Sequence, residues 1–353
     1  MSRRLRSRWL GATAVVAALA LTLSACGSSD DEKSGATGSV PSGVDPHPLA
    51  KTTSLTVAVP ASLELFSQPY LAKEYGEFEK ENLDVTVVNL LPADAVTQLA
   101  AGKIDACICA FNPGVFNAID AGLPIRAVAG TFSGLQKGVG IYVKPSLAAD
   151  QPQSLKGKKL AISSGFASAV VTDLMRWLEP AGMDLGDITP VNVPATDTLT
   201  ALEHGGADAA YLLEPFSEMA TKNKTGVFVP ITQPTSLSTG FFFGDRLRES
   251  DPAAGAAFLR AIVRTTREHL QGDYHANADT VRTMAAALGM DAKALTSTPG
   301  VTFDPDLTTS SWPAQIESVQ KIWGTLDDVI QYQKPLAVDR VLDTHLLDTV
   351  LGK

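Results

Sequence analysis

The 353-residue sequence has little cysteine, little charge and no long apolar run beyond its N-terminus. Three cysteines are too few for a disulfide framework, so we expect buried apolar area to stabilise the fold. Only 19% of the residues are charged, and 38 acidic residues against 29 basic ones give a net charge of −9. This balance disfavours nucleic acid as a partner, because phosphate binding depends on clustered Lys and Arg. The length and the 45% hydrophobic content instead indicate about two globular domains.

The N-terminus carries the pattern of an export signal. Four arginines within the first eight residues precede the uncharged apolar run 9–23. This run is shorter than the roughly 20 residues of a transmembrane helix, so a signal peptide is favoured over a permanent span. The run ends in Leu-Ser-Ala-Cys26, which resembles the bacterial lipobox, in which the cysteine is acylated and becomes the mature N-terminus. We therefore expect a lipoprotein signal peptide over 1–25, lipidation at Cys26, and an exported protein anchored to the outer face of the cell membrane.

The segment after the lipobox is typical of a flexible tether. Residues 26–53 are rich in Gly, Ser, Pro, Asp and Thr and hold too few large apolar groups to offset the entropy of ordering. Removal of the signal takes away four arginines and no acidic residue, which changes the net charge from −9 to −13. The folded part is expected to begin near Ser54.

A sequence pattern recurs within the body at an offset of 103 residues. Each copy is expected to form a strand, a helix that Asp94 or Asp197 caps, and a second strand that follows Gly102 or Gly205. The matched positions are Val88, Asn89, Leu90, Asp94, Thr97, Leu99, Gly102, Asp105 and Ala106 in the first copy, and Val191, Asn192, Val193, Asp197, Thr200, Leu202, Gly205, Asp208 and Ala209 in the second.

Another strand and helix precede each copy, so each half is predicted to be a β-α-β-α-β unit. Right-handed crossovers make each unit a small doubly wound α/β lobe. The expected strands are 55–59, 85–90, 106–110 and 125–131 in the first half, and 159–163, 188–193, 209–213 and 227–231 in the second. The helices that follow the first strand of each half are expected over 68–80 and 167–181. Beyond residue 245 the sequence predicts helices at 252–270, 278–288, 313–323 and 338–350.

Several of these segments resemble one known family. Residues 70–76 (YLAKEYG) and 78–85 (FEKENLDV), followed by 154–159 (SLKGKK) and 205–215 (GGADAAYLLEP), are similar to the sulfonate, nitrate, taurine and thiamine-precursor group of ABC-transporter substrate-binding proteins. The resemblance covers about 54–353 and lies in the order and spacing of the segments.

The resemblance implies the type 2 periplasmic-binding-protein fold, in which two doubly wound α/β lobes are joined by two crossing strands around a ligand cleft. Residues 139–144 would enter lobe 2 (139–238) and 239–243 would return, so lobe 1 is discontinuous (54–138 plus 239–353). It also implies capture of a small molecule outside the membrane by hinge closure and delivery to a membrane permease. We expect a monomer with no cofactor.

Ligands of open α/β sheets bind beyond the carboxyl ends of the strands, and five loops meet this condition. Each of the five, 60–69, 110–114, 131–134, 163–168 and 214–216, contains a phenylalanine that could sandwich a flat ligand or merely seal the sheet end. Neutral donors lie beside them, and Ser164-Gly165 is expected to open a helix that holds an anion, or to act as a plain cap. The candidate ligand-binding residues are Phe66, Gln68, Phe111, Asn112, Thr131, Phe132, Ser164, Gly165, Phe166 and Glu214.

Glu214 is either a ligand contact, which would accept from an amino or amide group, or an exposed first-turn acid. If it faces the cleft, nitrate is disfavoured, and the five loops also contain no arginine. Sulfonates and heteroaromatic compounds such as pyrimidines are therefore the expected ligands.

Cysteine and histidine offer no predicted metal site. Cys107 and Cys109 alternate with Ile108 on a strand and point to one face, where they are expected to serve as small buried hydrophobic residues. The five histidines, His47, His204, His269, His275 and His345, have no i, i+4 partner and are expected to be solvated.

The expected function is therefore that of a non-enzymatic carrier. An enzyme on the same fold would need a nucleophile or base with its partner, and no Ser/His/Asp or Cys/His pairing falls in the five loops. The cysteine-rich motif of the family's pyrimidine-synthase branch is also absent. An enzyme acting on a small cofactor precursor, and a ligand-sensing partner of a membrane receptor, remain the alternatives.

Overall fold

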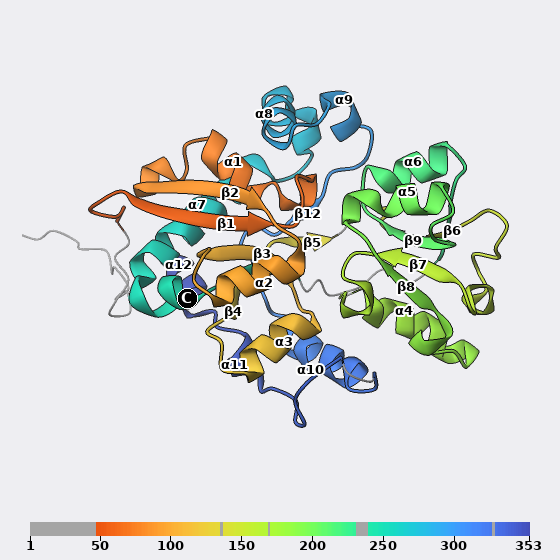
Figure 1. The fold of residues 1–353 in the computed structure, drawn as a ribbon. Coiled ribbons are helices and arrows are strands. Elements are labelled where there is room, and N and C mark those ends of the chain that lie inside the picture. Colours follow the sequence, from red (N-terminus) through yellow and green to blue (C-terminus); the bar gives the residue numbers. More distant parts are fainter. Residues whose placement is uncertain (1–46, 135–136, 169, 231–238, 327–328) are drawn as a thin grey trace, which may run out of the picture. The chain divides into compact units, whose positions relative to one another are not determined.

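The computed structural model describes residues 47–134, 137–168, 170–230, 239–326 and 329–353. Two five-stranded mixed sheets, each flanked by helices, form its framework (Figure 1). The first sheet draws its strands from 53–130 and 239–243, and the second draws its strands from 140–228. The predicted signal peptide, the lipidation site Cys26 and most of the tether lie outside the described residues.

The first sheet has the strand order β2-β1-β3-β11-β4, in which β11 runs antiparallel to both neighbours. Its side chains alternate between two cores, as the period of a strand requires. Val57 and Ile108 enter one core, whereas Ala58 and Cys107 enter the other. The strands are β1 Thr53–Val59, β2 Leu83–Asn89, β3 Ala106–Ala110, β4 Arg126–Gly130 and β11 Thr239–Phe243.

The second sheet repeats this arrangement in the order β8-β7-β9-β6-β10, with β6 antiparallel to β9. The pairing registers also correspond, because Val57 lies opposite Ala106 in the first sheet and Leu160 opposite Ala209 in the second, 103 residues later. The strands are β6 Gly140–Val143, β7 Lys159–Ile162, β8 Thr189–Asn192, β9 Ala209–Leu212 and β10 Val227–Phe228. The sequence repeat is thus a structural repeat.

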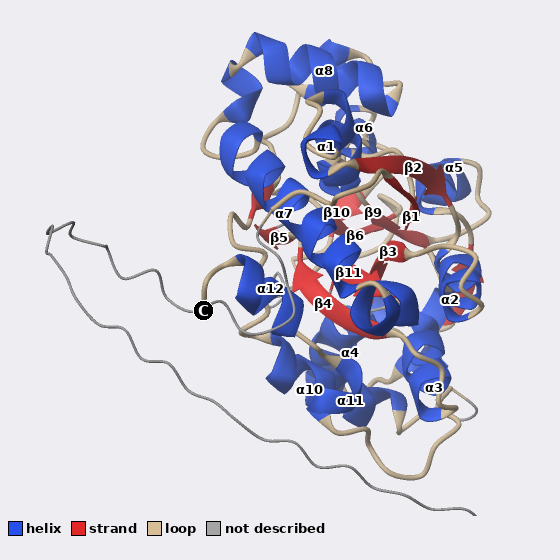
Figure 2. Cartoon of the chain, turned by 90° about the vertical axis from the view of Figure 1, so that its left-hand side faces the viewer, coloured by secondary structure: helices blue, strands red, loops and turns tan. Residues whose placement is uncertain are grey.

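Helices lie on both sides of the sheets (Figure 2), and β5 Phe132–Gly134 pairs with β12 Thr302–Phe303 in a separate two-stranded sheet. The helices are α1 Gln68–Glu74, α2 Pro92–Ala100, α3 Pro113–Asp120, α4 Val171–Leu178, α5 Thr198–Glu203, α6 Phe216–Lys222, α7 Pro252–His269, α8 Ala278–Leu288, α9 Ala292–Leu295, α10 Trp312–Trp323, α11 Val338–Val341 and α12 His345–Val350. Among the described residues, we find no helix whose length and apolar content would let it cross a membrane.

Three predicted helices are shorter than the sequence suggested. The helix expected over 68–80 ends at Glu74, because Gly76 adopts a left-handed conformation with φ of 71°. The segment expected over 338–350 divides into α11 and α12, because Leu342 is extended and bridges Ala127.

The helix expected over 167–181 begins only at Val171, after Ser164 and Gly165 both take positive φ. A 3₁₀ turn over Gly165–Ala167 precedes it. This late start changes which residues stand at the helix N-terminus.

The two helix ends predicted at glycines were right, and the two predicted aspartate caps were not. Gly102 and Gly205 have φ of 64° and 78°, as expected for residues that terminate helices. Asp94 lies inside the first turn of α2, because Pro92 at the start of the helix sets its N-terminus at Leu91. Asp197 occupies the cap position of α5, but its side chain makes no capping hydrogen bond.

The fold class expected from the sequence is confirmed. Two doubly wound α/β units with the same strand order, each including one antiparallel strand, constitute the type 2 periplasmic-binding-protein fold. The chain passes between the sheets twice, after β5 into β6 and after β10 into β11.

Candidate functional site

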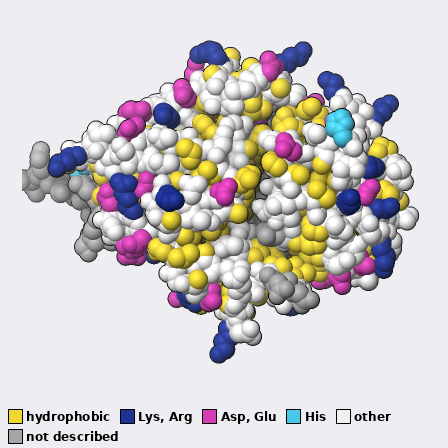
Figure 3. Space-filling view, in the orientation of Figure 1, with side chains coloured by type: hydrophobic (Ala, Val, Ile, Leu, Met, Phe, Trp, Pro, Cys, Tyr) yellow, Lys and Arg dark blue, Asp and Glu magenta, His cyan; other side chains and the backbone are white. Residues whose placement is uncertain are grey.

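A pocket of about 190 Å³ lies between the carboxyl ends of the two sheets. From the first sheet it takes residues that follow β1 and end β3, and from the second sheet it takes residues that follow β7 and β9. This is where ligands of open α/β sheets bind, because the strand ends leave a crevice there. The space-filling view in Figure 3 shows hydrophobic side chains beside the hollow in the middle of the molecule.

The two sides of the pocket differ in chemistry. The first wall is mainly apolar and consists of Pro60, Leu65, Phe66, Pro92, Ile108, Cys109, Ala110, Asn112, Phe132, Thr239 and Gln315. The second wall is richer in polar groups and consists of Ile162, Ser163, Ser164, Ser168, Val170, Thr172, Asp173, Ala195, Thr198, Tyr211 and Leu213. One side is thus suited to apolar contact and the other to hydrogen bonding.

Asp173 is the charged residue of the pocket lining. It lies in the first turn of α4, and its side chain is 13% exposed. Burial raises the pKa of Asp173 to about 6, and Arg176, whose Nη1 lies 3.1 Å from Asp173 Oδ1, opposes the rise. Burial, together with the charge of Asp173, also raises the pKa of Tyr211, so its hydroxyl remains a donor at neutral pH.

A wider groove of about 700 Å³ adjoins the pocket. It runs along α2 and α3 on one side and residues 192–194 on the other, and it shares Pro92, Asn112, Ser163 and Ser164 with the pocket lining. These shared residues make the groove and the pocket neighbouring parts of one hollow.

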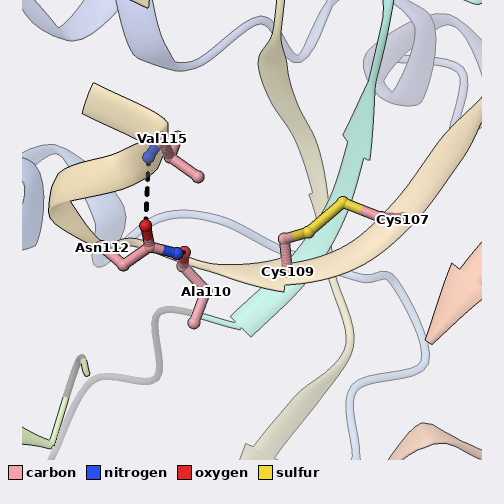
Figure 4. The surroundings of a disulfide bond; sticks show 5 residues. All are labelled: Cys107, Cys109, Ala110, Asn112 and Val115. Carbon is pink, nitrogen blue, oxygen red and sulfur yellow. Dashed lines mark hydrogen bonds between the residues drawn. A yellow bond between two sulfur atoms is a disulfide. The ribbon is translucent and has the colours of Figure 1, made fainter. Parts of the chain in front are cut away.

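Four of the predicted site residues line the pocket: Phe66, Asn112, Phe132 and Ser164. Asn112 caps α3, since its Oδ1 accepts from Val115 N at 3.0 Å and its Nδ2 donates to Ala110 O (Figure 4). The backbone N–H of Ser164 donates to Asn192 Oδ1 at 2.9 Å. Both residues are therefore already engaged in bonds within the protein.

Phe111 lies in the core rather than on the pocket wall. Its ring is fully buried and packs edge-on against Phe116, Phe242 and Trp312. Of the two interpretations left open by the sequence, the structure places Phe111 as a residue that seals the sheet end.

Gln68 and Thr131 are buried and outside the residues that line the pocket. Gln68 Nε2 donates to Thr266 Oγ1 at 2.8 Å and to Thr131 O at 3.4 Å, while Thr131 Oγ1 donates to Thr239 O at 3.0 Å. These bonds tie α1 and α7 to the segment between β4 and β5 and give both side chains a structural role.

Gly165 and Phe166 form part of the turn before α4. Gly165 is left-handed, and the half-buried Phe166 packs on the core of the second sheet. Because α4 begins at Val171, Ser164 does not open an α-helix as expected but precedes the 3₁₀ turn Gly165–Ala167, and an anion site there stays a prediction.

Glu214 is buried rather than exposed, and its Oε2 accepts from Glu218 N at 3.2 Å. Burial raises its pKa. It does not belong to the pocket lining, and the carboxylate of the pocket is instead Asp173. Asp173 lies in the first turn of α4, the helix that follows β7. It was missed from the sequence because this helix was expected to start at residue 167 instead of Val171.

Cys107 and Cys109 were expected to be separate small hydrophobic residues, but the structure joins them in a disulfide (Figure 4). Their common orientation was predicted correctly, and it is what allows the bond, since their Cα atoms lie 5.6 Å apart. Cys109 also lines the pocket.

Two of the five histidines are not solvated, contrary to the expectation from the sequence. His275 is largely buried, with Nε2 2.8 Å from Glu64 Oε1, and the ring of His269 stacks on Tyr75 with a centroid distance of 3.6 Å. His269 also lies in the one group of possible metal ligands within the described residues, with Glu77 and Glu268. Glu77 already pairs with Lys80 and Arg264, and these cations disfavour a metal ion there.

A comparison with known protein families shows to which family the chain belongs. Residues 66–271, more than half of the chain, match the family described as NMT1/THI5 like. The chain belongs to the NMT1/THI5-like family. This agrees with the family resemblance seen in the sequence.

Relatives of this NMT1/THI5-like protein carry different names. A protein of Bacillus subtilis (strain 168) named for aliphatic sulfonate binding is 27% identical over 210 residues, which cover 57% of this chain and 62% of the relative. The 4-amino-5-hydroxymethyl-2-methylpyrimidine phosphate synthase of Aspergillus parasiticus is 25% identical over 213 residues, 56% of this chain and 60% of the relative. The chain thus spans less than two thirds of the length of either relative.

Solved structures share the fold at low identity. The alkanesulfonate-binding protein SsuA from Xanthomonas axonopodis pv. citri, bound to MOPS, has a TM-score of 0.66 at 19% identity and covers 83% of this chain and 99% of its own. The periplasmic nitrate-binding protein NrtA from Synechocystis PCC 6803 has a TM-score of 0.68 at 15% identity, with 87% and 90% covered. At these identities the likeness concerns the fold alone.

Proposed function

We propose that this NMT1/THI5-like protein is the solute-binding component of an ABC importer. It captures a small organic molecule in the pocket between the two sheets and delivers it to a membrane permease. The observation that carries the proposal is the pocket itself, whose walls come from the strand ends of both sheets. A relative and two solved structures named for the binding of sulfonates or nitrate support it.

The expected ligand is a sulfonate or a heteroaromatic compound such as a pyrimidine. A pocket of about 190 Å³ is smaller than the roughly 300 Å³ at which pockets for drug-sized ligands begin, so it suits a single ring, and a larger ligand would extend into the adjoining groove of about 700 Å³. Phe66 and Phe132 offer apolar faces, and the second wall offers hydroxyl groups.

Binding would close the two lobes, 54–138 plus 239–353 and 139–238, about the connections between them. Two passages of the chain between the sheets are compatible with such a hinge. A lipid anchor at Cys26 would hold the exported monomer beside its permease, and residues 26–53 would act as the tether.

A thermal-shift screen of the purified protein tests the proposal. The panel contains ethanesulfonate, taurine, 4-aminopyrimidine, riboflavin and nitrate. A ligand at 100 times its dissociation constant stabilises the native state by about 2.7 kcal/mol, which is a shift of roughly 5 °C for a chain of this size.

The variant Ala195→Phe fills the pocket wall and should abolish the shift, whereas Ala292→Phe on the exposed face of α9 should leave it unchanged. Equal shifts in both variants would contradict binding in this pocket.

A synthase is the second candidate, because one relative is named as a pyrimidine phosphate synthase. The pocket lining in the described part of the chain contains no histidine, and its cysteine is held in a disulfide. Turnover of any panel compound by the purified protein, without a thermal shift, would favour the enzyme over the carrier.

A further inference from the structure

The position of Asp173 restricts what the pocket can bind. Its carboxylate lies in the second wall and is largely shielded from water, while the facing wall is mainly apolar. Its partner Arg176 is 57% exposed and is not among the residues that line the pocket. A ligand in the pocket therefore contacts the residue that carries the negative charge, while Arg176 offsets part of that charge from outside the lining.

The pocket also has little to offer an anion. None of the described residues that line it is Lys, Arg or His. The Val115 N–H at the start of α3 is taken by Asn112, and the Ser164 N–H is taken by Asn192. At the start of α4 the N–H groups of Val171 and Asp173 already donate to Ser168 O and Val170 O, and Asp173 supplies the negative charge that the helix dipole favours there.

We infer that the pocket selects an organic molecule that presents a protonated nitrogen or a pair of N–H groups to Asp173, with its ring against Phe66 and Phe132, and that it rejects organic anions, sulfonates included. This rests on the proposed function as a binding protein and narrows its substrate class. Among the expected ligands it favours amino-substituted heteroaromatic compounds over sulfonates.

The chemistry of the wall agrees with this selection. Two N–H groups of an amidine or an aminopyrimidine can bond a carboxylate side by side, which fixes orientation as well as charge. Tyr211, whose hydroxyl stays protonated, provides a further polar contact on the same wall. The pKa of about 6 leaves Asp173 ionised at neutral pH, ready for a cation.

A set of four benzene derivatives separates the effect of charge from that of shape. Benzamidine, benzamide and benzoate share a flat ring with a planar substituent and differ in charge, and benzenesulfonate adds the sulfonate group. Calorimetric titration of the purified protein at pH 7.5 is expected to show benzamidine bound at least tenfold more tightly than benzamide, with benzoate and benzenesulfonate weakest.

The variant Asp173→Asn should weaken benzamidine binding about thirtyfold, because a charge pair out of water is lost. The affinity of the variant for benzamide should stay within a factor of about three of the original, and its affinity for benzoate should be no weaker than that of the unaltered protein. The matched control Asp150→Asn removes an exposed acid outside the pocket and should change none of the four affinities. Far-UV circular dichroism of each variant checks that it is folded.

Three outcomes would overturn the inference: benzenesulfonate bound as tightly as benzamidine, benzamidine binding unchanged in Asp173→Asn, or no binding of benzamidine at all. The first of these would still support the protein as a binding protein. Loss of the proposed function itself would instead appear as no thermal shift with any panel compound together with turnover, so the two failures are distinguishable.

Discussion

The two walls of the pocket come from halves with the same strand order, yet they present different chemistry. Ile108 on β3 and Tyr211 on β9 occupy equivalent positions, 103 residues apart, and both line the pocket. The first wall thus places an alkyl group where the second places a hydroxyl. The same offset relates Tyr70, whose hydroxyl donates to Asn89, to Asp173, which faces the pocket.

The comparison shows that one scaffold, used twice, supports two kinds of contact. The strands and their registers correspond, because both sheets need the same apolar pattern to pack between helices. The residues at the strand ends do not pack between helices, so they can differ between the two halves without destabilising the sheets. An apolar wall gives affinity for a ring, and a polar wall opposite it decides which end group is accepted.

Removal of Phe111 should have the largest effect and should act on stability. The ring is fully buried among three aromatic side chains, so Phe111→Ala is expected to lower the free energy of unfolding by about 3 to 5 kcal/mol. Phe166 in the second half is only half-buried, and Phe166→Ala should cost about 1 kcal/mol. Urea denaturation of both variants measures the difference.

Comparable losses in the two variants would contradict the distinction between a core residue and a turn residue. The benzamidine affinity of any Phe111→Ala protein that remains folded is expected to be unchanged, since Phe111 is outside the pocket lining.

The variant Asp173→Asn should make the protein more stable at pH 7.5. A folded-state pKa of about 6, against the ordinary aspartate value of 3.8, means that the ionised carboxylate destabilises the fold by about 3 kcal/mol. The penalty is fully present above pH 6 and is lost as the pH falls toward 3.8. We therefore expect a gain of about 2 to 3 kcal/mol for the variant at pH 7.5 and almost none at pH 4, with urea denaturation at each pH as the measurement.

The exposed control Asp150→Asn should show no such dependence on pH. A variant that is less stable than the unaltered protein at pH 7.5 would mean that the pair with Arg176 outweighs the cost of burial. A binding function would explain why the protein keeps an ionised Asp173 that lowers its stability, since groups in binding sites are often less stable there than elsewhere in the fold.

The framework of the fold could be predicted from the sequence because the signals are local. The strand at 106–110 was expected at the bounds observed, since a short apolar run between turn residues leaves little choice. The strand at 239–243 was also expected at its observed bounds, but from the family resemblance. Gly102 and Gly205 end their helices because a residue without Cβ takes positive φ most easily.

The site could be predicted only in part, because it depends on where individual side chains point, and the sequence does not give those orientations. Phe111 follows a strand that ends at the pocket, but its ring turns into the core. Asp173 was missed because Ser164, a residue with a side chain, adopts φ of 69° and delays the start of α4. The disulfide was missed because a regular strand places residues i and i+2 about 6.6 Å apart, near the upper limit for a disulfide, whereas the Cα atoms of Cys107 and Cys109 lie 5.6 Å apart.

Binding of a permanently charged cation should weaken as the pH falls. Benzamidine needs ionised Asp173, and with a pKa of about 6 the ionised fraction falls to about one tenth at pH 5, so the affinity should drop about tenfold from pH 8 to pH 5. Tyr211, whose pKa is raised, stays protonated over this range, and Arg176 lies 3.1 Å from Asp173. Titration at pH 8, 7, 6 and 5 measures the change, with neutral benzamide as the control that should not respond.

The smallest expected effect tests the apolar wall. Phe66→Leu keeps a buried apolar side chain in the first wall but removes the aromatic face, which should weaken binding of a ring by about 1 kcal/mol, or roughly fivefold. Because this wall contacts the ring and not the end group, benzamidine and benzamide should lose the same factor in calorimetric titration. Phe228→Leu, on the exposed edge strand β10 and outside the pocket lining, should change neither affinity. A loss confined to benzamidine would mean that the two walls do not divide the ligand as proposed, since an apolar substitution would then be altering the recognition of charge.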